Sequence, residues 1–156
     1  MLQLTNKTLQ KQYQNILTAS YNTLKLKGDL VLELEFVDSD TIKQINNEHR
    51  GKDKSTDVLS FGFLELAASN IGEYQEFSKE NYPLDFDEEY NAVFIGSVVI
   101  CKEIAIAQAK EYGQSEKEEI EYLLVHAILH LLGHDHEIVD IDKKLMRALE
   151  EKILNR

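Results

Sequence analysis

Four of the five histidines of the chain lie in one short stretch, from His126 to His136. His126 and His130 are four residues apart, so on a helix their imidazoles lie on the same face, one turn apart. That spacing allows both rings to bind one metal ion at about 2.0–2.1 Å from each nitrogen. Gly133 ends the helix and permits a chain reversal that brings His136 back as a third ligand. Three protein ligands leave a fourth position for water, which is typical of catalytic rather than structural zinc.

The residues around the histidines favour this interpretation. Residues 122–132 are nearly all apolar apart from the two imidazoles, so the helix is expected to be buried on most sides. Buried imidazoles need polar partners, and a metal ion supplies one. His134 is the alternative third ligand, but its place beside Gly133 makes its reach harder than that of His136. We expect one zinc ion per chain, with another divalent transition metal as the alternative.

The same spacing occurs in the metzincin peptidases, in which a glutamate follows the first histidine and acts as general base. Ala127 occupies that position. Without a carboxylate, the motif lacks the group that takes a proton from the metal-bound water. Peptidase activity is therefore a distant alternative.

Composition and length predict one soluble domain covering residues 1–156. The chain has a mass of 18.0 kDa, 43% hydrophobic and 29% charged residues, and one proline. Its one cysteine, Cys101, can form neither an intrachain disulfide nor a cysteine metal cage. We expect no signal peptide, and no apolar run approaches the ~20 residues that span a bilayer. A reducing, cytoplasmic location without membrane contact follows as the expectation.

The net charge of −11 argues against nucleic-acid binding when taken alone. The charge is uneven, however. Residues 64–91 contain eight acidic residues and one basic residue, a net −7, and are expected to form a long acidic surface loop. Arg50, Lys52 and Lys54 form a small basic cluster elsewhere. The charge therefore weakens a nucleic-acid function without excluding it.

Hydrophobic spacing predicts the elements that position these residues. They are a helix over 6–25, a strand over 30–37, a short helix from Asp38 or Ser39 to about Glu48, a loop over 50–56, strands over 57–63 and 92–100, a helix around 104–112, a helix from the capping box Ser115/Glu118 to about Leu132, and a last helix around 145–153. This order predicts an α+β fold in which a small mixed β-sheet packs with about five helices. The zinc-binding helix lies in the C-terminal half.

Two sequence blocks resemble the YbeY family of rRNA maturation factors. Residues 126–136 are similar to the family signature H-[GA]-x-L-H-L-x-G-[aromatic]-D-H. Residues 45–50 and 56–61 are similar to its L-N-x-x-[aromatic]-R…T-[DN]-V-L-S-F block. Residues 95–100 and the tail from Met146 to Leu154 match more weakly.

The resemblance implies a metal-dependent, single-strand-specific endoribonuclease that acts in 16S rRNA 3′-end maturation and ribosome quality control. It implies that His126, His130 and His136 are the zinc ligands and that Arg50 is the active-site arginine. The implied partners are single-stranded RNA or rRNA, with the ribosome or its proteins as further partners. Hydrolysis would use the metal, with Arg50 neutralising charge that builds on the phosphate.

The sequence departs from the family pattern in several places. Ser97 replaces the family acid of the third block, His134 replaces the aromatic residue before Asp135, and Gly62 replaces the usual proline. The loop over 64–91 is longer and more acidic than expected. A non-catalytic ribosome-assembly module with a structural metal remains the second hypothesis, favoured if His134 or His49 closes the metal site.

Two further acidic residues have two interpretations each. Asp57 either pairs with Arg50 or a ligand histidine, or caps the start of a strand. Asp135 has the same two readings. Cys101 is expected to start a helix as a small core residue.

Overall fold

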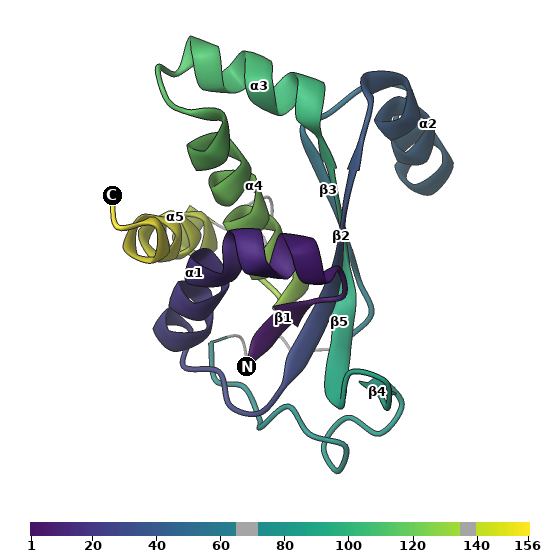
Figure 1. Ribbon diagram of the computed structural model, residues 1–156, viewed down its shortest axis with the longest axis vertical. Coiled ribbons are helices and arrows are strands. Elements are labelled where there is room, and N and C mark those ends of the chain that lie inside the picture. Colours follow the sequence, from purple (N-terminus) through teal and green to yellow (C-terminus); the bar gives the residue numbers. More distant parts are fainter. Residues whose placement is uncertain (65–71, 135–139) are drawn as a thin grey trace.

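The computed structural model describes residues 1–64, 72–134 and 140–156, together with the side chains of these residues except 140–142. Within these parts the chain forms a mixed sheet with helices on both faces (Figure 1). The predicted α+β class is confirmed. His136 and Asp135 lie outside the described residues. No helix in the described parts is long and apolar enough to cross a membrane.

The sheet has the order β1-β2-β5-β3, with β4 also pairing with β5. The strands are β1 (Leu2–Leu4), β2 (Leu30–Val37), β3 (Val58–Gly62), β4 (Phe86–Asp87) and β5 (Ala92–Cys101). β1, β2 and β5 are parallel, whereas β3 and β4 run antiparallel to β5. Strand β1 was not predicted from the sequence. Its three residues form a strand because Leu2–Leu4 pair in register with residues 30–32 of β2.

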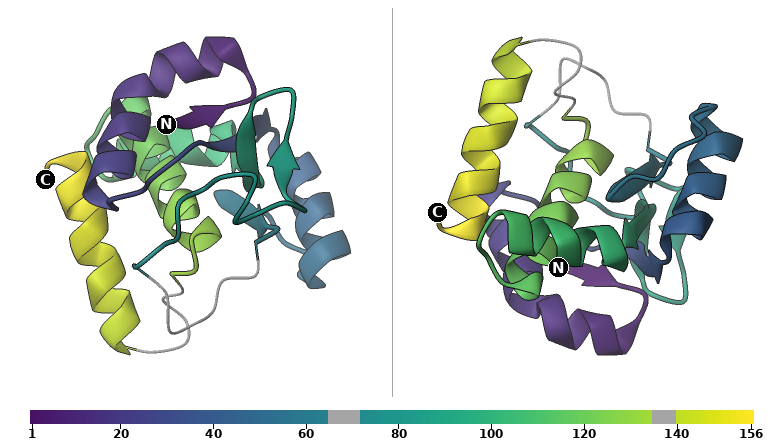
Figure 2. Two further views of the ribbon diagram at one scale, coloured as in Figure 1. Left: turned by 90° about the horizontal axis from the view of Figure 1, so that it is seen from below. Right: turned by 90° about the horizontal axis from the view of Figure 1, so that it is seen from above.

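The helices divide unequally between the two faces of the sheet. They are α1 (Lys7–Thr23), α2 (Ser39–Arg50), α3 (Lys102–Glu111), α4 (Glu116–Leu131) and α5 (Asp140–Leu154). Figure 1 shows α1, α4 and α5 on one side of the sheet and α2 on the other. The larger core lies beneath α1, α4 and α5, and a smaller cluster around Ile42 and Leu59 lies beneath α2. The views in Figure 2 show α5 alongside α1 and α4.

Local signals explain where the site-bearing helices begin. Helix α4 begins at the predicted capping box, in which Ser115 and Glu118 each accept a hydrogen bond from the other's backbone N–H. The side chain of Asp38 caps α2 by accepting from the Thr41 N–H. Cys101 is buried at the start of α3, as expected.

The acidic segment is only in part the surface loop that the sequence predicts. Phe77 is 2% exposed, and its carbonyl accepts a hydrogen bond from the Asp29 N–H. Phe86 and Asp87 form β4 on the sheet. The segment is therefore anchored at Phe77 and at β4, whereas Leu84 between them is 97% exposed. The sequence pattern of the segment did not reveal these two anchors, because each consists of only one or two residues.

Helix α4 packs directly on the sheet at Gly96 of β5. A Cβ atom at Gly96 would lie 2.3 Å from the Phe61 carbonyl oxygen and 2.7 Å from Cδ2 of Leu131, in a backbone with φ of +149°. Only glycine allows this approach. Because Leu131 follows His130, the contact fixes the depth at which the histidine-bearing end of α4 lies.

We expect Gly96→Ala to lower the free energy of unfolding by roughly 2–3 kcal/mol, because a methyl group overlaps both the backbone of β3 and the Leu131 side chain. Gly113→Ala is the matched control. It has φ of +68° but no atom within 4 Å of the added Cβ, so it should cost only about 1 kcal/mol. Urea unfolding measures both variants. Equal losses would show that the overlap with Phe61 and Leu131 costs nothing beyond the backbone strain that both variants share.

Candidate active site

The two histidines of α4 face each other on one side of the helix. The Nε2 atoms of His126 and His130 lie 3.1 Å apart, and their rings meet edge to face with centroids separated by 4.6 Å. Both side chains are half-buried, whereas most of α4 between residues 123 and 131 is fully buried. The predicted convergence of these two imidazoles is thus present in the fold.

Glu150 of α5 lies behind His126. Its Oε2 is 3.3 Å from Nδ1 of His126, and the residue is only 8% exposed. A carboxylate only accepts, so Nδ1–H of His126 is the donor in this hydrogen bond. Sequence reasoning assigned Glu150 no role. One sequence feature could have indicated a role: Glu150 lies among the apolar positions of α5 that include Met146 and Ile153, which are both buried.

Tyr122 lies one turn before His126, with its ring centroid 5.9 Å from the imidazole. Burial, together with the charge of Glu150, a hydrogen bond to Glu150 and smaller contributions from the charges of Glu119 and Asp57, raises the pKa of Tyr122 to about 12. The Tyr122 phenol therefore stays protonated at neutral pH and remains a hydrogen-bond donor beside Glu150.

The predicted set of three metal ligands is not seen among the described residues. Across residues 1–64, 72–134 and 140–156, no group of three His, Cys, Asp or Glu side chains is placed to hold a metal ion. His136 lies outside these ranges. His134 is 1% exposed, and its backbone N–H donates to the Leu129 carbonyl at 3.0 Å. Gly133, which follows the C-cap residue Leu132, adopts φ of +97°, as expected for a residue that ends a helix.

Arg50 is the last residue of α2, not part of the loop that the sequence predicts. Asn46 explains the extension: its Nδ2 donates to the Lys54 carbonyl at 2.9 Å, which closes the following turn onto the helix. Arg50, Lys52 and Lys54 are all exposed. In the described part of the chain, no hydrogen bond or ion pair engages the Arg50 side chain.

The structure places Arg50 and the histidines on opposite faces of the edge strand β3. His49, next to Arg50, packs on Phe61 with ring centroids 5.1 Å apart. On the other face, Gly62 lies against Leu131, the neighbour of His130. One strand therefore separates the two groups that the sequence assigned to one site.

Asp57 contacts neither Arg50 nor a histidine in the described structure. Its Oδ1 accepts from the Val58 N–H at 2.8 Å, which confirms that it caps the start of a strand. Its Oδ2 accepts from Nε2 of Gln108 at 3.3 Å, and the same amide donates to Glu119 at 3.0 Å. Gln114 also donates to Glu119, which is 1% exposed.

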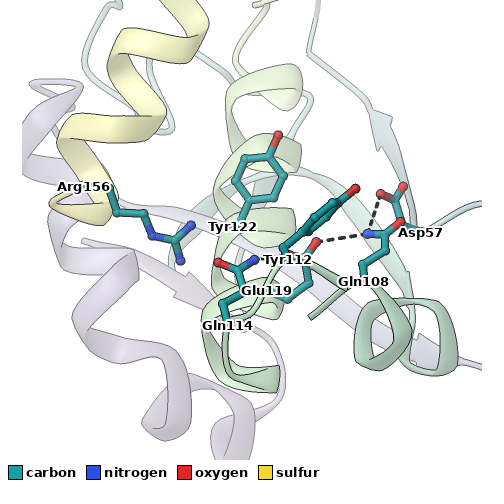
Figure 3. Close-up of a pocket in the computed structure, with 7 residues that line it drawn as sticks. All are labelled: Asp57, Gln108, Tyr112, Gln114, Glu119, Tyr122 and Arg156. Atoms are coloured by element: carbon teal, nitrogen blue, oxygen red, sulfur yellow. Dashed lines mark hydrogen bonds between the residues drawn. The ribbon is translucent and has the colours of Figure 1, made fainter. Parts of the chain in front are cut away.

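These polar residues border a cavity of about 410 Å³ (Figure 3). Sequence reasoning missed Gln108, Gln114 and Glu119 because their association depends on how α3 packs on α4. Tyr112 is 62% exposed at the cavity. Cys101 is fully buried and takes no part in either site.

Comparison with known proteins assigns the chain to a family. The family model described as "Endoribonuclease YbeY" matches residues 2–156. Relatives from several bacteria carry that same name. The Syntrophomonas wolfei protein is 37% identical over 150 residues, covering 96% of this chain and 87% of its own. The Clostridium acetobutylicum protein is 39% identical over 153 residues, covering 96% and 89%. The Clostridium beijerinckii protein is 42% identical over 127 residues, covering 80% and 73%.

A solved structure has the same fold. The solution structure of TM1509 from Thermotoga maritima superposes with a TM-score of 0.56 at 24% identity, covering 99% of this chain and 90% of that one. The match of the family model over nearly the whole chain agrees with the motif that carries the paired histidines. The chain belongs to the YbeY family of endoribonucleases, whose role is rRNA maturation.

Proposed function

We propose that this chain is a zinc-dependent, single-strand-specific endoribonuclease that acts in 16S rRNA 3′-end maturation and in ribosome quality control. The observation that carries the proposal is the convergence of His126 and His130 on one face of a buried helix, with Glu150 behind them. The rRNA substrate would place this activity in the cytoplasm, next to the ribosome and its proteins.

The paired imidazoles fit a metal ion. Two nitrogens bound at about 2.0–2.1 Å to one tetrahedral ion lie roughly 3.3 Å apart, close to the 3.1 Å between the two Nε2 atoms. His136 would be the third ligand, three residues beyond Gly133. A bound zinc ion would supply Lewis-acid activation of a phosphoryl oxygen and of water.

Glu150 would orient the first ligand. By accepting the Nδ1–H of His126, its carboxylate fixes the imidazole tautomer and ring plane and leaves Nε2 as the coordinating atom. Tyr122, protonated at neutral pH, would in turn hold Glu150. Both residues would prepare the metal ligand and take no direct part in cleavage.

Arg50 would bind the RNA phosphates from the far side of β3. Its guanidinium is exposed beside Lys52 and Lys54, the basic cluster of an acidic chain. Since β3 is an edge strand, a flexible single strand passing over it would meet Arg50 on one face and the histidines on the other. A duplex is too stiff to bend around one strand, which supports single-strand specificity.

Elemental analysis tests the metal site. The purified protein should contain about one equivalent of zinc, and His126→Ala and His136→Ala should lose most of it, because each removes one of three ligands. His49→Ala, an exposed histidine on α2, is the control and should keep the full content. Zinc retained in His136→Ala but lost in His134→Ala would make His134 the third ligand.

Glu150→Gln should lower the affinity for zinc by about 10–100-fold, the usual loss when the partner of a ligating imidazole is removed. The pKa of Tyr122 should fall at the same time because the neighbouring charge is gone. Competition with a chelator and tyrosine NMR measure the two effects. Glu151→Gln changes an exposed neighbour and should alter neither. Unchanged zinc affinity in Glu150→Gln would remove this residue from the site.

Arg50→Ala should keep the fold and the zinc, because Arg50 ends a helix and is exposed. Single-turnover cleavage of a labelled single-stranded RNA should fall by about 10²–10³-fold, the typical cost of losing one charge partner of the transition state. Arg50→Lys should recover only part of this loss. Lys52→Ala is the control for loss of a nearby positive charge. Wild-type cleavage by Arg50→Ala would refute a catalytic role.

A further inference from the structure

The end of α4 leaves a buried carbonyl group that the helix itself does not satisfy. Leu132, the C-cap residue, is fully buried. The last carbonyls of a helix have no intrahelical partner, and a buried carbonyl without a hydrogen bond opposes folding. The backbone N–H of Gly133 donates to the His130 carbonyl at 3.0 Å. That of His134 donates to the Leu129 carbonyl at the same distance. These two bonds form a Schellman turn, which leaves the Leu132 carbonyl in need of another donor.

A tyrosine of the acidic segment supplies this donor. The partly buried hydroxyl of Tyr74 donates to the Leu132 carbonyl at 2.8 Å, although the two residues are 58 positions apart in the sequence. In both views of Figure 2, the teal chain that follows residue 71 lies beside the end of α4. The acidic segment is thereby joined to the helix turn that directly follows the paired histidines.

The buried anchor at Phe77 holds Tyr74 in place. The ring centroids of Tyr74 and Phe77 lie 6.0 Å apart, and Tyr82 stacks on Phe77 with centroids 5.0 Å apart. The Phe77 N–H donates to the Lys27 carbonyl at 2.8 Å. A Cβ atom at Gly28 would lie only 2.2 Å from the Phe77 carbonyl oxygen, so glycine is needed for this close approach. The Tyr74 hydroxyl therefore reaches α4 from a segment that is bound to the chain just before β2.

The turn that Tyr74 contacts determines how the chain leaves the histidines. Leu132 follows His130 by two residues, and the Gly133 N–H is bonded to the His130 carbonyl. A displaced Leu132 carbonyl would alter this turn, and with it the backbone of His130 and the direction in which the chain leaves the helix. Ligands that are not held in the coordination geometry have to reorganise before they bind, which lowers the affinity for the metal.

We infer that Tyr74 is a positioning residue for the metal centre, because its hydroxyl holds the turn after α4 in the conformation in which the histidines bind the ion. The inference rests on the proposed zinc site. Tyr74 acts through the Leu132 carbonyl and touches neither the metal nor the RNA. The acidic segment, which its composition describes only as a charged surface loop, thereby gains a role in the site.

Tyr74→Phe removes only the hydroxyl and should weaken zinc binding by the full chain about 10-fold, the lower end of the usual loss for an outer partner of metal ligands. Competition with a chelator measures this affinity. Tyr90→Phe is the matched control from the same segment, because its hydroxyl donates to the Thr5 carbonyl at 3.5 Å, and it should keep the wild-type affinity. A loss of stability alone would leave the zinc affinity of the folded protein unchanged. Wild-type affinity in Tyr74→Phe would overturn the inference.

Amide hydrogen exchange tests the turn without any metal. In the metal-free full chain, Tyr74→Phe should raise the exchange rates of the Gly133 and His134 N–H groups about 10-fold, because one hydrogen bond that opposes opening of the turn is lost. Amides in the middle of α1 should exchange at the wild-type rate. Unchanged exchange at Gly133 and His134 would show that Tyr74 does not hold the turn. A wild-type protein that binds no zinc would refute the proposed metal centre itself, whereas zinc binding that is insensitive to Tyr74→Phe would refute only the role of Tyr74.

Discussion

Each polar side chain on a buried helix needs a hydrogen-bonding partner. Helix α4 has such partners at two points along its length. Near its start, Glu119 is fully buried and accepts from the amides of Gln108 and Gln114. Near its end, His126 and His130 face each other, and Glu150 accepts from the far nitrogen of His126. Without these partners, the desolvation of the imidazoles and the carboxylate would oppose folding of α4 into the core.

The packing of α4 on the sheet positions the paired histidines. Gly96 and Gly62 carry no side chains toward Leu131, so the histidine-bearing end of α4 lies close against β3 and β5. Because β3 is the edge strand, the other face of the same strand holds the end of α2. The strand β3 therefore separates the end of α2, which carries the exposed Arg50, from the histidine-bearing end of α4.

Much of this arrangement was readable from the sequence, because the signals were local. The Ser115/Glu118 capping box and Gly133 marked the two ends of α4, and alternation of leucine with glutamate marked β2. What remained hidden depends on long-range contacts. Strand β1 exists only through its pairing with β2, and the bond from Gln108 to Glu119 only through the packing of α3 on α4. Glu150 is an acidic residue among the apolar positions of α5. Its role could be assigned only once the structure placed it beside His126.

The central claim is that α4 provides an open metal centre built on His126 and His130. X-ray absorption at the zinc edge, on the zinc-reconstituted full chain, tests it directly. Three imidazole nitrogens at about 2.0–2.1 Å together with one oxygen ligand is the expected first coordination sphere. A fourth protein ligand in place of that oxygen would instead indicate a closed, structural site. A sphere of oxygen ligands without imidazole would contradict a metal centre on α4.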